Sequence, residues 1–76
     1  MEPTDNQLNT LYGWIRWQMP TAEAQHAIKW LGNNATRREV SNEIKRIGEL
    51  YHNHRLNREL CFKGSVWAKY GEEYGQ

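Results

Sequence analysis

Three histidines and one cysteine are the side chains of this sequence best suited to metal binding. His52 and His54 are two residues apart, which on a helix places them about 200° around the axis from each other, so they cannot share one ion. His26 and Cys61 have no partner at a metal-ligand spacing. We therefore predict no metal site and interpret the histidines as solvated or hydrogen-bonded side chains.

The hydroxyl and thiol groups also lack the surroundings that activate a nucleophile. Ser41 and Ser65 are outside any nucleophile-elbow pattern, and Cys61 lies between Leu60 and Phe62 with no electropositive motif. The sequence has no glycine-rich phosphate loop, and a chain of 76 residues rarely encloses a catalytic pocket alone. We expect a non-enzymatic protein without a cofactor, in which Cys61 is a buried, unreactive thiol.

Length, cysteine content and charge restrict the remaining classes of protein. Seventy-six residues form one domain, and a single cysteine excludes an internal disulfide and suits a reducing compartment. No basic start precedes an apolar run, and no stretch of eighteen apolar residues occurs, so we predict a cytoplasmic protein without membrane contact. The net charge is only +1, but residues 36–63 carry seven basic against four acidic side chains. A basic surface is therefore expected in the middle of the chain.

Apolar periodicity predicts two helices in the first half of the chain. Residues 4–7 match a capping box, which begins a helix that runs to about Gln18 and is stopped by Pro20. Thr21 can cap a second helix, which ends at Gly32, a residue suited to a left-handed C-terminal position. The expected buried positions are Leu8, Leu11, Tyr12, Ile15 and Met19 in the first helix and Ala24, Ala27, Ile28 and Leu31 in the second.

A third, longer helix is predicted after a second capping box at residues 36–39, and it persists to about Asn53 or Arg55. Its apolar stripe consists of Val40, Ile44, Ile47 and Tyr51. Its acidic residues, Glu39, Glu43 and Glu49, are better explained as a solvated face than as acid–base pairs.

Beyond residue 55 the pattern leaves two alternatives open. Residues 60–70 can pair as a hairpin, or a short last helix can begin at Ser65. The helix is favoured because Ala68, Lys69, Glu72 and Glu73 are poor strand formers. The predicted fold is an all-α compact three-helix bundle with a short fourth C-terminal helix, forming one domain over residues 1–76.

A basic arc lies on the third helix beside its apolar stripe when the residues are projected at about 100° each. It contains no acidic residue and comprises Arg37, Arg38, Ser41, Lys45, Gly48, His52 and Arg55. Such an arc can contact phosphates or an acidic protein, and it can also be an ordinary solvated flank. A DNA-reading helix-turn-helix is disfavoured, because the apolar position six residues after the turn glycine Gly32 is occupied by Arg38.

Tryptophans form a second candidate surface. Trp17 points away from the apolar stripe of the first helix, while Trp14 and Trp30 flank the stripes of their helices. These rings are either covered by the aromatic C-terminal segment or exposed as an interface. The favoured hypothesis is a protein–protein interaction module, a small regulator or inhibitor, that contacts another protein or itself through Trp14, Trp17 and Trp30. Nucleic-acid binding by Arg37, Arg38, Lys45, His52 and Arg55 is the alternative.

Overall fold

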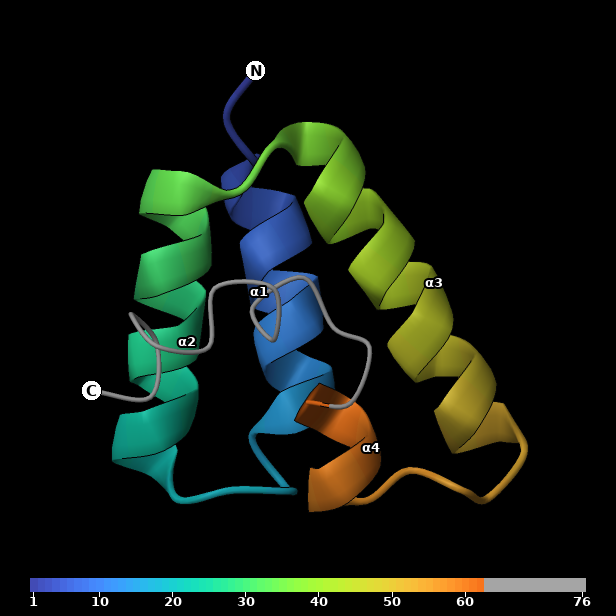
Figure 1. The fold of residues 1–76 in the computed structure, drawn as a ribbon. Coiled ribbons are helices and arrows are strands. Elements are labelled where there is room, and N and C mark those ends of the chain that lie inside the picture. The colour runs from blue at the N-terminus through green and yellow to red at the C-terminus, as the bar shows by residue number, and fades with distance from the viewer. Residues whose placement is uncertain (63–76) are drawn as a thin grey trace.

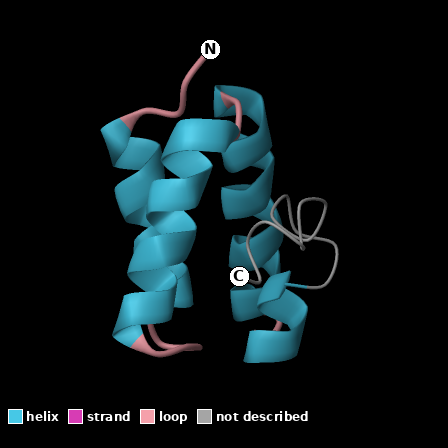
Figure 2. Cartoon of the chain, turned by 60° about the vertical axis from the view of Figure 1, so that its left-hand side comes forward, coloured by secondary structure: helices cyan, strands magenta, loops and turns pink. Residues whose placement is uncertain are grey.

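Four helices account for the part of the chain that the computed structural model describes, residues 1–62 (Figure 1). They are α1 (Asp5–Ile15), α2 (Thr21–Asn34), α3 (Arg37–His52) and α4 (Arg58–Phe62). α1 lies between α2 and α3; α1 and α3 run in the same direction, α2 runs in the opposite direction, and α4 lies at the end of the bundle where α1 and α3 finish. Within residues 1–62 there is no strand, as the cartoon in Figure 2 shows. The predicted all-α helical bundle is confirmed; its short helix α4 precedes the C-terminal helix that was expected to begin at Ser65.

Reciprocal capping hydrogen bonds set the beginnings of α1 and α3. The hydroxyl of Thr4 accepts the backbone N–H of Gln7 at 3.1 Å, and the Gln7 side chain accepts the N–H of Thr4 at 3.0 Å. Thr36 and Glu39 repeat the arrangement at 3.1 and 2.9 Å. Both capping boxes read from the sequence are therefore confirmed, because they depend only on four adjacent residues.

The core lies where the apolar faces of the first three helices meet, and α1 packs against both α2 and α3. Gly32 allows the close approach of α1 and α2, since a Cβ atom there would lie 3.2 Å from Cδ1 of Leu8. Leu8 itself is half-buried, together with Tyr12, Ile28 and Ile44. The remaining predicted stripe positions up to Ile47 are buried, namely Leu11, Ile15, Met19, Ala24, Ala27, Leu31, Val40 and Ile47.

One helix beginning and two helix ends differ from those predicted. Thr21 is the first residue of α2 and not its cap, because Pro20 occupies the N-cap position without a side-chain hydrogen bond. α2 does not end at Gly32 but continues to Asn34, and Ala35 then turns the chain with an extended backbone at φ −92° and ψ 162°. Gly32 was thus misread as a terminator, and its lack of a side chain serves packing against Leu8 instead. α1 ends at Ile15, earlier than Gln18, and residues 16–18 form a turn.

α4 is held on the bundle by two arginines. The guanidinium of Arg46 donates to the carbonyl oxygens of Leu60 at 2.7 Å and Cys61 at 2.8 Å, which are acceptors in the last turn of α4. Arg58 forms an ion pair of 2.7 Å with Glu23 near the beginning of α2. Residues 60–62 are helical, so they do not form the first strand of the alternative hairpin; the rest of that hairpin and the helix predicted to begin at Ser65 lie outside the described residues.

Glu43 corrects the expectation of a solvated acidic face on α3. Its side chain is buried, with 4% of the residue exposed, and both carboxylate oxygens accept hydrogen bonds from Arg46, at 2.7 and 3.0 Å. The pair is covered because α4 docks on this side of α3 through the same arginine. Glu49 is exposed, as predicted, and Glu39 is half-buried.

Candidate binding surface

Aromatic rings from α1 and α3 meet at the end of the bundle where both helices finish. The ring centroids of Trp14 and Tyr51 are 4.7 Å apart, with the ring planes tilted by 55°. His52 contacts both rings edge-on, at 6.3 Å from Trp14 and 5.5 Å from Tyr51. The contacts of Trp14 with Tyr51 and His52 cross between two helices that are far apart in sequence, so they fix the relative position of the rings.

Trp17 lies beside this cluster and is 74% exposed. Its exposure follows from the early end of α1, since Trp17 lies in the turn between the buried residues Ile15 and Met19. The guanidinium carbon of Arg16 lies 4.4 Å from the centroid of the Trp17 ring, within the range of a cation–π contact. The neighbouring arginine thus covers one face of the indole and leaves the rest of the ring in solvent.

Between these rings lies a cavity of about 430 Å³, which we call the aromatic hollow. It is lined by Gly13, Trp14, Trp17, Gln18, Tyr51 and Leu56. Such a volume falls within the range of about 300 to 1,000 Å³ that is usual for binding sites. Three aromatic side chains and one leucine make it apolar, and Gln18 adds an amide that can donate and accept hydrogen bonds.

The structure brings two of the three predicted tryptophans together. Trp14 and Trp17 line the aromatic hollow, whereas Trp30 is half-buried on α2 and packs against the core. Tyr51 joins the site although periodicity placed it in the buried stripe, and it is 52% exposed. Its ring packs against Trp14 in the last turn of α3, close to the C-terminal end of α1.

The basic arc is exposed along the length of α3. Every side chain assigned to nucleic-acid contact, from Arg37 and Arg38 through Lys45 to His52 and Arg55, faces solvent. His52 also contacts Trp14, so the arc meets the aromatic hollow at this residue. The two surfaces predicted separately are therefore neighbours.

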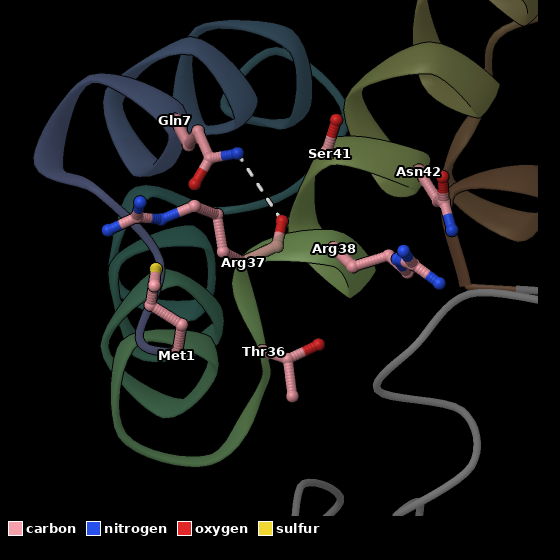
Figure 3. A pocket seen from close by; sticks show the side chains of 7 residues that line it. All are labelled: Met1, Gln7, Thr36, Arg37, Arg38, Ser41 and Asn42. Carbon is pink, nitrogen blue, oxygen red and sulfur yellow. Dashed lines mark hydrogen bonds between the residues drawn. The ribbon is translucent and has the colours of Figure 1, made fainter.

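A second cavity, of about 600 Å³, lies where α3 begins. Figure 3 shows the guanidinium groups of Arg37 and Arg38 pointing away from each other, with the side chain of Gln7 donating to the Arg37 carbonyl at 3.3 Å. The Arg37 side chain itself donates to the carbonyl of Glu2 at 3.2 Å. Arg37 thus joins the N-terminal residues to α3, which leaves Arg38 as the freer of the two cations. The cavity is lined by Met1, Gln7, Thr36, Arg37, Arg38, Ser41 and Asn42.

Cys61 and the histidines do not assemble a reactive centre in the described part of the chain. Burial raises the pKa of the Cys61 thiol to about 11; the charge of Arg46 lowers it and that of Glu43 raises it. No group of three histidine, cysteine or acidic side chains suited to a metal ion occurs among residues 1–62. Over the same residues, no helix has both the length and the apolar character that crossing a bilayer requires.

Comparisons with protein-family models, with curated proteins and with solved structures give no significant match to this chain.

Proposed function

We propose that this chain is a protein-binding module that contacts another protein, or a second copy of itself, through the aromatic hollow. The observation that carries the proposal is the exposure of Trp17, at 74%, at the rim of a cavity walled by Trp14 and Tyr51. Tryptophan and tyrosine are the side chains most often found as energetic anchors of protein interfaces. Trp30, half-buried on α2, is left outside this contact.

We further propose that the module is non-enzymatic and cytoplasmic, as a small regulator or inhibitor would be. The raised pKa of Cys61 supports a non-enzymatic role, because a thiol that is protonated at neutral pH is a poor nucleophile. The single cysteine supports a cytoplasmic location, because a chain without an internal disulfide suits a reducing compartment.

Trp17→Ala tests the protein-binding proposal. Because the indole is mostly in solvent, the substitution should change the free energy of unfolding by no more than about 0.5 kcal/mol. Loss of a central tryptophan anchor should weaken the contact by about 2 kcal/mol or more, roughly thirtyfold in affinity.

Sedimentation equilibrium measures self-association, and affinity capture from the native host measures binding of another protein. Gln25→Ala, an exposed substitution on α2, is the control and should leave both unchanged. If Trp17→Ala left every association intact but lowered the melting temperature, Trp17 would be a stability residue and the proposal would be wrong.

Nucleic-acid binding by the basic arc is the second candidate. It is supported by the cavity at the beginning of α3, where Arg38 and Ser41 line an open surface continuous with the arc. Four arginine and lysine contacts to phosphates would lower the affinity by about 100-fold between 50 and 200 mM salt. A gel shift with mixed DNA and RNA that shows no retardation at low salt would exclude this candidate.

A further inference from the structure

We propose that the aromatic hollow binds an acidic peptide segment of a partner protein, which inserts one bulky apolar side chain between Trp14 and Trp17. The flanking carboxylates of this segment face Arg16, His52 and Arg55. The inference rests on the proposed function and adds the chemistry of the partner. It follows from the charges around the hollow, the orientation of its rings and its size.

The charge around the hollow is of one sign in the two segments that line it. Residues 13–18 and 51–56 carry the positive charges of Arg16 and Arg55 together with the imidazoles of His52 and His54, and neither segment contains an aspartate or glutamate. Arg16 lies against Trp17, and Arg55 directly precedes the lining residue Leu56. Complementary charge at the rim of an interface favours binding and accelerates association, whereas like charge opposes it. An acidic segment therefore fits these rims, and a basic one is repelled.

The orientation of the rings favours a peptide over a single-stranded nucleic acid. The rings of Trp14 and Tyr51, which line the hollow, are tilted by 55° to each other, so they form two walls of a pit. Sequence-tolerant binding of single strands uses open ring faces on which successive bases stack. Here Arg16 covers one face of Trp17, and the ring of Tyr51 packs against that of Trp14. These walls suit one apolar side chain that enters the hollow between them from the solvent.

The size of the hollow indicates a segment and not a broad protein face. About 430 Å³ is near the lower limit for binding sites and suits one anchoring side chain with the adjoining backbone. Gln18 lines the same cavity, and its amide can pair with a peptide N–H or carbonyl. Apolar anchoring by one side chain with main-chain hydrogen bonds beside it is a common mode of peptide recognition.

The test is an NMR titration of the full ¹⁵N-labelled chain, observed at the indole N–H signals of Trp14 and Trp17. Four probes distinguish the effects of the ligand's charge, of its phenylalanine anchor and of its chemical class. They are Ac-GEEFEEG-NH2, Ac-GEEGEEG-NH2, Ac-GKKFKKG-NH2 and an oligothymidylate. The acidic phenylalanine peptide should bind at least about tenfold more tightly than each of the others, because only it offers both the anchor and the complementary charge. Trp17→Ala should weaken its binding by about tenfold or more.

Charge reversal at the rim provides the second arm of the test. Arg55→Glu should weaken binding of the acidic phenylalanine peptide by about fivefold or more and bring the basic peptide closer to it in affinity. Lys29→Glu, an exposed residue on α2, makes the same change in net charge away from the hollow and should have no effect. Circular dichroism checks that both variants remain folded.

The inference is overturned if millimolar acidic phenylalanine peptide shifts neither indole signal, or if the basic peptide or the oligothymidylate binds more tightly. It is also overturned if Lys29→Glu and Arg55→Glu weaken binding equally. If the chain still associates through Trp17 but does not bind the acidic phenylalanine peptide, only the inference of an acidic partner is rejected. If neither the Trp17-dependent association nor binding of the peptide is observed, the proposed function is rejected as well.

Discussion

Glu43 shows how a single charged residue in this chain comes to be buried. Its carboxylate receives two hydrogen bonds from Arg46, and the same guanidinium continues to the backbone of α4. A buried carboxylate is tolerated when it is paired in this way, and removing one partner leaves the other charge uncompensated. The residue therefore contributes to stability, although periodicity alone places it at the edge of the apolar stripe.

Substitution of Glu43 by glutamine should destabilise the chain by about 1–3 kcal/mol, because Arg46 loses its counter-charge while the shape of the side chain is kept. Urea unfolding followed by circular dichroism measures the change. Glu49→Gln, exposed on the same helix, is the control and should stay within about 0.5 kcal/mol of the natural sequence. Equal effects of the two substitutions would show that the Glu43–Arg46 pair adds nothing.

Cys61 should react slowly with thiol reagents. At pH 8 a thiol with a pKa of about 11 has roughly 100-fold less thiolate than one at the ordinary 9.0, so alkylation should be slower by at least that factor than in urea. Mass spectrometry of iodoacetamide-treated protein gives both rates, and equal rates would contradict burial of the thiol. The stability conferred by the protonated thiol is complete below pH 9 and is lost as pH rises from 9 to about 11.

At the scale of elements, the end of α3 depends on His54. Its φ of 58° is in the left-handed region, and the N–H groups of His54 and Arg55 bond the carbonyls of Tyr51 and Leu50. This is the hydrogen-bond pattern of a Schellman motif, in which the left-handed position usually carries glycine. A histidine there is strained, because its Cβ approaches the following carbonyl.

His54→Gly should therefore raise the free energy of unfolding by about 0.5–1 kcal/mol, since relief of the left-handed strain exceeds the extra entropy lost by glycine. Thermal denaturation by circular dichroism measures the gain. Ser41→Gly, at an exposed right-handed position inside α3, should instead lower stability by about 0.5–1 kcal/mol. A loss of stability in His54→Gly would show that the histidine side chain makes a contact that outweighs the strain.

Helix beginnings could be predicted from this sequence better than helix ends. The capping boxes at Thr4 and Thr36 are complete within four residues, so local sequence determines them. The ends depend on packing: Gly32 has the residue type of a terminator but is held in helix against Leu8, while His54 ends α3 without the expected glycine. Packing against a neighbouring helix can therefore outweigh a local sequence signal for the end of a helix.

At the scale of the whole molecule, the candidate site was predictable only in its separate parts. Periodicity assigned Trp14 and Trp17 to one helix and the basic arc to another; Trp14 is on α1, whereas Trp17 lies in the turn after it and Arg55 lies beyond the end of α3. The meeting of Trp14 with Tyr51 depends on how α1 packs against α3, which no spacing in the sequence specifies. The aromatic hollow is therefore a property of the tertiary structure.

A single core also predicts that the three long helices unfold together. Leu31 is fully buried between them, and Leu31→Ala should cost about 2–5 kcal/mol. Because a domain of this length has only a few kcal/mol of stability, the variant should lose most of its helical circular dichroism at 25 °C. Trp17→Ala, at the exposed rim of the aromatic hollow, should keep nearly all of it. If Leu31→Ala retained a partial helical signal with its own unfolding transition, the helices would not share one cooperative core.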